Sequence, residues 1–298
     1  MFPLVYVLIG GKCMDLYRKV FQALYDSLAK LCEDGQDPSE PAYMLIDFEQ
    51  AAWTAFRRIF RKTTVQGCLF HFGQNVYKRI LKYGFSERYI SDLQFNTQCK
   101  MLLALAFVPV DDVVKVYETF IQHPECVLEK DRKLIMYFER VYIGQTVKTR
   151  KGQGRRPPCF SIAFWNCHNR LLGGVQRTTN NAKGWHNGYA TSSGSVIPDI
   201  YTFFGKLQLE QNLQEGRIGK LKKGEKPEPQ RREFKELTER LMAVAVMYND
   251  MDPLEYLENI SRNVEMSWKD GEDESDSDGS EDWRCGKACC IGPVDFAL

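Results

Sequence analysis

Long apolar runs are missing from this sequence of 298 residues. A helix that spans a bilayer needs roughly 20 predominantly apolar residues, and no stretch of the chain reaches that length. Residues 1–10 resemble a signal peptide at first sight, but no basic residues precede their apolar run and the run is too short for export. We therefore expect a buried strand at this place, no membrane partner, and a protein that is not secreted.

Acidic residues are absent from residues 141–198, although the whole chain has a net charge of only +1. The basic residues of that segment are Lys148, Arg150, Lys151, Arg155, Arg156, Arg170, Arg177 and Lys183. Residues 270–282 show the opposite imbalance, with many acids and no base. This segregation predicts a polyanion-binding face and an acidic tail. Because residues 269–298 are acidic and of low complexity, they cannot bury a core, and we expect a disordered tail.

Cysteine and histidine do not gather into the groups that a metal or disulfide scaffold needs. The ten cysteines are scattered over a chain long enough to fold without crosslinks, so a reducing interior is expected. Cys68 and His71 are spaced like two zinc ligands, whereas a closed zinc site needs four. A buried Cys beside a His at a helix start is the simpler interpretation, and zinc binding stays open.

Strand and helix patterns alternate over the first ninety residues. Apolar, β-branched runs at 4–9, 42–47 and 65–70 predict strands, and helical spacing predicts helices at 15–31, 51–60 and 71–81. This βαβαβα order predicts a parallel sheet with right-handed crossovers. Only helical periods follow, so 87–146 is expected to be a helical insertion, 147–158 a basic linker, and 222–268 a set of C-terminal helices. Residues 1–86 and 159–221 would then form the core domain.

Three landmarks follow one another along the chain. The first is Asp47-Phe48-Glu49 at the end of an apolar run, and the second is the pair Cys68 and His71. The third is the segment from 177 to 186, which contains Asn180, Asn181, Gly184, Trp185 and His186. In this order the landmarks resemble the transposases of Mutator-like elements, over roughly residues 2–204. The resemblance implies an α/β fold: a ribonuclease-H-like parallel sheet, here incomplete, with a helical insertion and the disordered acidic tail.

The resemblance also implies a catalytic site that this chain has largely lost. Active relatives cut and join DNA with three carboxylates that hold Mg²⁺, and Asp47 matches the second of them. Lys183 stands where the family has its third carboxylate, a Glu. The first carboxylate belongs to a strand upstream of the run that residues 4–9 resemble. We therefore expect no strand cleavage and no resident cofactor, with Asp47 at most a weak metal ligand. A helix cap is the alternative role for Asp47.

With the opening strands missing, the strand at 4–9 is predicted to pair directly and in parallel with the strand at 44–47. The helix at 15–31 would form the right-handed crossover between them.

Basic residues near aromatic side chains provide the candidate DNA-binding surface, because phosphates need cations and unpaired bases stack on rings. The candidates are Arg57, Arg58, Arg61, Lys62, Lys148, Arg150, Lys151, Arg155, Arg156 and Arg177. Any single charge cluster is more often plain solvated surface.

The leading hypothesis is a catalytically inactive protein derived from a DNA transposase, nuclear, with residual and nonspecific DNA binding. One alternative is a protein-interaction module without DNA binding. Another is a fragment of an active transposase that upstream sequence completes. A cytoplasmic location and assembly as a homo-oligomer stay open.

Overall fold

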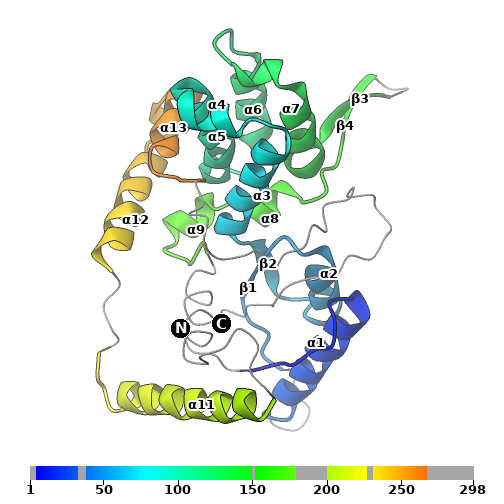
Figure 1. Ribbon diagram of the computed structural model, residues 1–298, viewed down its shortest axis with the longest axis vertical. Coiled ribbons are helices and arrows are strands. Elements are labelled where there is room, and N and C mark those ends of the chain that lie inside the picture. The colour runs from blue at the N-terminus through cyan, green and yellow to red at the C-terminus, as the bar shows by residue number, and fades with distance from the viewer. Residues whose placement is uncertain (1–4, 33–37, 150–151, 179–199, 227–230, 267–298) are drawn as a thin grey trace.

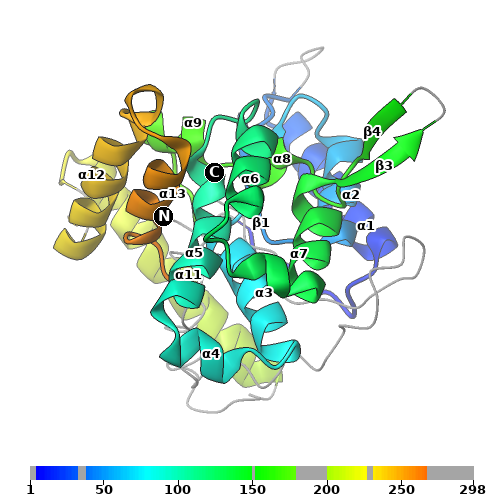
Figure 2. The same cartoon turned by 90° about the horizontal axis from the view of Figure 1, so that it is seen from above.

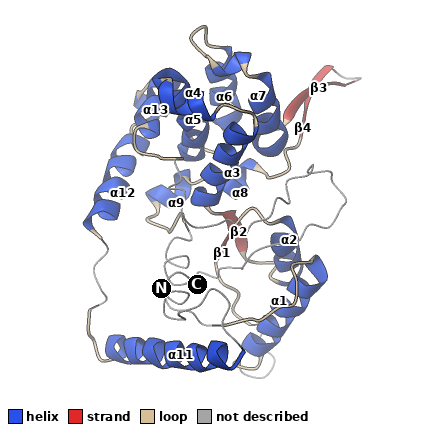
Figure 3. Cartoon of the chain, viewed as in Figure 1, coloured by secondary structure: helices blue, strands red, loops and turns tan. Residues whose placement is uncertain are grey.

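The computed structural model describes residues 5–32, 38–149, 152–178, 200–226 and 231–266. It is a mixed α/β fold, mostly helical, with two small sheets of two strands each (Figure 3). Within the described part of the chain, no helix is both long enough and apolar enough to cross a membrane.

A parallel pair of strands lies at the centre of the chain's first third. β1 (Tyr43–Ile46) and β2 (Thr64–Gly67) pair in register, from Tyr43 opposite Thr64 to Ile46 opposite Gly67. α1 (Met14–Ala29) precedes β1, α2 (Gln50–Ile59) connects the two strands, and α3 (Leu69–Lys82) follows β2 (Figure 1). The alternation predicted from residue 15 onward is therefore confirmed, and both strands end at the same edge of the sheet.

The strand predicted at 4–9 is wrong for its described residues, because 5–9 adopt no strand conformation. Val5 and Val7 are each 46 % exposed and Leu8 is 70 % exposed, while Ile9 packs against the core. Apolar side chains that remain in water gain nothing from strand formation. The predicted pairing of this segment with β1 is also wrong, since the described strand beside β1 is β2.

Helices alone occupy residues 86–143, as the helical periods predicted. They are α4 (Ser86–Ser91), α5 (Leu93–Ala104), η1 (Leu105–Phe107), α6 (Val113–Gln122), η2 (Leu128–Lys130), α7 (Arg132–Phe138) and the π-helical turn η3 (Glu139–Ile143). Phe95, Cys99 and Leu102 of α5 are fully buried, so α5 is the central helix of this region (Figure 2).

The basic linker predicted at 147–158 is instead a β-hairpin that projects from the helical region. β3 (Gln145–Thr149) and β4 (Gly152–Arg156) are antiparallel. Gly144 precedes β3 with a φ of +94°, and a Cβ at this position would collide with the carbonyl oxygen of Arg156. Gly144, which lies just before the predicted linker, therefore permits the close approach of the two strands.

An aromatic cluster joins the sheet to the helical region. The Phe48 ring lies 4.9 Å from that of Phe160, 5.3 Å from Phe164 and 6.0 Å from Phe72, measured between centroids. α8 (Ile162–Trp165) and α9 (His168–Leu172) follow this cluster in sequence. Because neighbouring residues of an extended chain point to opposite sides, burial of Phe48 directs Asp47 and Glu49 to the other side.

The remaining described helices are α11 (Ile200–Lys222), α12 (Arg232–Ala245), η4 (Tyr248–Asp250) and α13 (Pro253–Ser261). α13 packs against α5, and the Tyr256 hydroxyl donates to the carbonyl oxygen of Phe107 over 2.6 Å. Asp252 caps α13 by accepting from the backbone N–H groups of Leu254 and Glu255. The C-terminal helices thus complete the core around α5.

Candidate functional site

Two hydrogen bonds connect the first two sequence landmarks, and the first residue of the third, at the edge where β1 and β2 end. The backbone N–H of Cys68 donates to the carbonyl oxygen of Ile46 over 2.8 Å. The next residue, Leu69, donates its N–H to the carbonyl oxygen of Arg177 over 3.0 Å. Asp47 follows Ile46 directly, and Arg177 opens the third landmark. Segments more than a hundred residues apart in sequence therefore converge where open α/β sheets bind their ligands.

A buried carboxyl group accompanies Asp47 at this edge. Glu49 is 5 % exposed, and its Oε2 accepts a hydrogen bond of 3.4 Å from the phenol of Tyr17 on α1. Its Oε1 has no hydrogen-bond partner in the described part of the chain. Burial, and then the negative charge of Asp47, raise the pKa of Glu49 to about 9. Glu49 is consequently protonated at neutral pH.

Asp47 is not the N-cap residue of the helix that follows it. α2 begins at Gln50, and Glu49 occupies the N-cap position without a side-chain cap hydrogen bond of its own. Asp47 is half-buried at the end of β1, on the side that Glu49 shares.

The acidic residues at this edge do not amount to a two-metal site. Two divalent ions need several carboxylate oxygens arranged around them, as in enzymes that displace phosphoryl groups in line. Among the residues that the structure describes, no group of three or more His, Cys, Asp or Glu side chains is arranged to hold a metal ion. Asp47 and Glu49 supply only two carboxyl groups, one of which carries a proton.

Cys68 and His71 lie at the start of α3, where the sequence places them. Cys68 is fully buried and is the N-cap residue, and His71 is half-buried in the first turn. The described residues around this pair add no further ligands that would complete a closed zinc site.

A buried arginine, which the sequence did not single out as a site residue, lies beside Cys68. Arg170 is 3 % exposed, and its Nη2 donates to the carbonyl oxygens of Gly67 and Asn166 and to the Sγ of Cys167. Its Nε and Nη1 have no hydrogen-bond partner within the described ranges. The contact with Gly67 attaches α9 to the end of β2, so Arg170 holds this edge of the sheet in place.

Arg177, a candidate DNA contact, is engaged inside the fold. Its Nη2 donates to Oγ1 of Thr238 on α12 over 2.9 Å. Burial lowers the pKa of Arg177, and the nearby positive charge of Arg170 lowers it further. Side chain and backbone of Arg177 therefore connect α12 to the start of α3.

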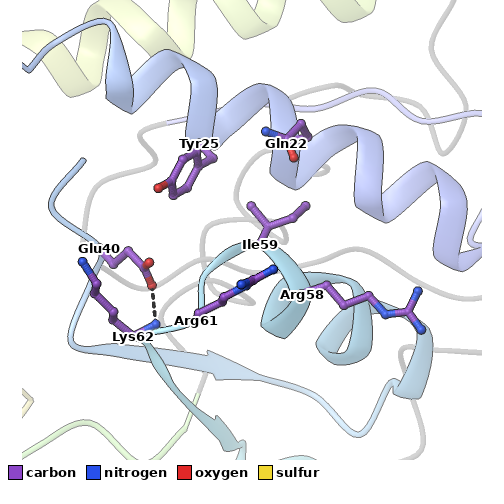
Figure 4. A pocket seen from close by; sticks show the side chains of 7 residues that line it. All are labelled: Gln22, Tyr25, Glu40, Arg58, Ile59, Arg61 and Lys62. Atoms are coloured by element: carbon purple, nitrogen blue, oxygen red, sulfur yellow. Dashed lines mark hydrogen bonds between the residues drawn. The ribbon is translucent and has the colours of Figure 1, made fainter. Parts of the chain in front are cut away.

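Four candidate DNA contacts are exposed around the end of α2: Arg57, Arg58, Arg61 and Lys62. A pocket of about 360 Å³ lies between them and α1, lined by Gln22, Tyr25, Glu40, Arg58, Ile59, Arg61 and Lys62 (Figure 4). The acid among the described lining residues is Glu40, whose Oε2 accepts from the backbone N–H of Lys62 over 2.7 Å and from the Thr63 hydroxyl over 3.2 Å. We call the four exposed cations the α2 basic cluster.

The hairpin presents two further cations to solvent, Lys148 and Arg156. Arg155 is different, because its guanidinium is ion-paired with Glu118 on α6 and donates to the carbonyl oxygen of Gly144 over 2.7 Å. Arg155 is therefore a structural contact between hairpin and helix. Arg150 and Lys151 lie outside the described residues.

The remaining predicted site residues, Asn180, Asn181, Lys183, Gly184, Trp185 and His186, also lie outside the described residues. Tyr17 was not predicted as part of the site. Helical spacing predicts the helix at 15–31, but it does not show which side chains of that helix reach the sheet edge. For Glu49 the sequence did give an indication, because alternation along a strand places it on the same side as Asp47.

Comparison of the chain with protein-family models, with curated proteins and with solved structures found no match in any of the three.

Proposed function

We propose that this protein derives from a Mutator-like transposase, that it no longer cleaves DNA, and that it binds duplex DNA without regard to sequence. Its parallel pair and flanking helices would be what remains of a ribonuclease-H-like core. The observation that carries the proposal is that the first two landmarks and Arg177, the first residue of the third, meet at one sheet edge.

The contact with Arg177 supports the proposal, because the order of strands and helices does not imply it. Cys68 bonds to the residue before Asp47, as expected for the ends of adjacent strands, whereas Leu69 bonds to Arg177, the first residue of the third landmark. A site built on this sheet edge would therefore draw on the first two landmarks and on Arg177.

The loss of cleavage follows from the charge at position 183. A lysine ammonium ~4 Å from a divalent ion, at an effective dielectric near 20, would be repelled by about 8 kcal/mol. The family's glutamate would instead attract the ion. The protonated Glu49 does not compensate, since metal ions bind the ionised carboxylate.

DNA affinity is supported by the α2 basic cluster, whose four cations are exposed and three of which, Arg58, Arg61 and Lys62, line the pocket beside α1. Cations of this kind neutralise backbone phosphates and release counterions, so binding should weaken steeply with salt. The logarithm of the affinity should fall linearly with the logarithm of the salt concentration.

The experiment is fluorescence anisotropy with labelled duplexes of two unrelated sequences over a series of salt concentrations. The test variant changes Arg57, Arg58, Arg61 and Lys62 to Gln. The matched control changes Lys115, Lys130, Arg132 and Lys133, which are exposed on α6 and around α7, away from α2 (Figure 1). We expect the test variant to lower the salt slope by about 0.9 for each lost phosphate contact and the control to change it little. Absence of salt-dependent binding, or an equal loss in both variants, would disprove DNA binding through this cluster.

A further inference from the structure

A groove of about 610 Å³ lies on the helical region, between α5, α13 and the connection from α6 to η2. Its apolar surface includes Leu93, Met101 and Phe120, and its acidic residues are Glu125, Glu255 and Glu258. α5 and α13 lie side by side, as do α13 and α6 (Figure 2). We call this feature the α5–α13 groove.

Among the residues that the structure describes, no lysine or arginine lines the α5–α13 groove. Glu258 is ion-paired with Arg262 over 2.7 Å, but Glu125 and Glu255 form no ion pair within the described part of the chain. The groove therefore combines the buried apolar side chains of Met101 and Phe120 with exposed carboxylates. A cationic occupant would gain attraction from at least two carboxylates that the protein itself leaves uncompensated.

Two large aliphatic side chains at the junction of α4 and α5 are exposed. Leu93 is 81 % exposed, and Ile90 at the end of α4 is also 81 % exposed. An occupant that covers both of these side chains must therefore be longer than the groove. A small molecule that fills the groove alone would leave Ile90 uncovered.

We infer that the α5–α13 groove binds a cationic amphipathic helix of a partner protein. The apolar face of that helix would insert toward Met101 and Phe120, with anchors at i, i+3, i+4 and i+7. Lysine or arginine on its flanks would face Glu125, Glu255 and Glu258. This binding is independent of DNA, because the groove residues are distinct from the α2 basic cluster.

The experiment uses the full chain and an 18-residue fluorescent peptide with leucine at helical spacing and lysine on the other face. A second peptide replaces every lysine by glutamate, and a third scrambles the first. The protein variants are Glu125→Gln, Glu255→Gln and Glu258→Gln combined, and Leu93→Ser alone. Because all four of these side chains are exposed, the changes leave the core intact. A control variant combines Glu215→Gln, Glu225→Gln and Glu233→Gln, which removes three exposed charges elsewhere.

We expect micromolar binding of the lysine peptide, at least tenfold weaker binding to the triple groove variant, and several-fold weaker binding to Leu93→Ser. The control variant should bind like the parent, and the glutamate and scrambled peptides should not bind. Equal binding of the lysine and glutamate peptides, or an unchanged affinity in the triple groove variant, would overturn the proposal. Sedimentation of the chain alone gives a further check, since a dimer that Leu93→Ser dissociates would make a second copy the occupant and would also overturn it.

Discussion

The phenol oxygen of Tyr17 lies 3.4 Å from Oε2 of Glu49, and this contact joins α1 to the residue that precedes α2. Both side chains are nearly inaccessible, with exposed fractions of 1 % and 5 %. Burial and the charge of Glu49 raise the pKa of Tyr17 above its ordinary range, so the phenol keeps its proton. Because Glu49 is also protonated, the contact is between two neutral groups at neutral pH.

This contact makes folding stability depend on pH. The carboxyl of Glu49 has an ordinary pKa near 4.5 when unfolded and about 9 when folded. Between these values the folded chain holds a proton that the unfolded chain releases. The contribution to stability is therefore complete below about pH 4.5 and is lost as the pH rises toward 9, by up to about 1.4 kcal/mol per pH unit.

Glu49→Gln should remove this dependence, because the amide is neutral at every pH and nearly the same shape. Urea unfolding at pH 5.5 and pH 8 should show a variant that is more stable than the parent at pH 8, with a smaller difference at pH 5.5. Glu225→Gln, at an exposed position, serves as the control. Parallel pH dependences for parent and Glu49→Gln would contradict the buried, protonated state.

Substitutions of the neighbouring residues Arg155 and Arg156 should differ in their effect on folding stability. Arg155→Gln removes an ion pair with Glu118 and a hydrogen bond to Gly144, and should cost about 1–2 kcal/mol of unfolding free energy. Arg156→Gln changes an exposed side chain and should stay within about 0.5 kcal/mol of the parent. Chemical denaturation of both variants tests the assignment, and a larger loss for Arg156→Gln would reverse it.

Lys183 determines the outcome of a nuclease assay. On the proposed descent, the unmodified chain should not nick supercoiled DNA with Mg²⁺ or Mn²⁺, and Lys183→Glu should also fail, because one Asp and one Glu cannot hold two metal ions in place. That variant should nevertheless gain thermal stability from the metal, by about 0.4 kcal/mol when free metal equals the dissociation constant. Metal-dependent nicking by the parent that Asp47→Asn abolishes would show that the site is active.

The acidic residues of 270–282 should compete with DNA for the basic surface. Removal of residues 270–298 is expected to strengthen binding to nonspecific duplex DNA at low salt. The gain should shrink as salt rises, since screening weakens the competition between tail and DNA. Equal affinities of the two chains at low salt, measured by anisotropy, would refute this prediction.

The helices and strands predicted from the sequence are found where the apolar residues of the element are buried against other elements. β1 and α3 were found close to their expected bounds, because their apolar residues are buried in the core. Residues 5–9 have the same composition but remain largely exposed, and composition cannot reveal whether a covering surface exists. The hairpin was missed because glycine and basic residues are typical of linkers, whereas its formation depends on contacts between Arg155 and α6.

For the candidate site, the sequence predicted the residues of the sheet edge but not their environment. Asp47 and Cys68 end adjacent strands, which follows from the alternation of strand and helix. The burial of Glu49 beneath Tyr17 and of Arg177 beside Arg170 depends on packing between distant elements. Arg177 looked like one more cation of the acid-free block, although its side chain is bound to Thr238.

The hydrogen bond from Tyr256 to Phe107 joins residues that are 149 positions apart in sequence, so its two partners are synthesised at different times. A ribosome adds about 5–20 residues per second, so the surface of α5 that α13 covers emerges about 7–30 s before α13 does. During that interval the helical region has an uncovered apolar side. Synthesis that stops between η1 and α13 would leave this side permanently open to aggregation or to chaperones. The core of the helical region is therefore completed only when α13 has been synthesised.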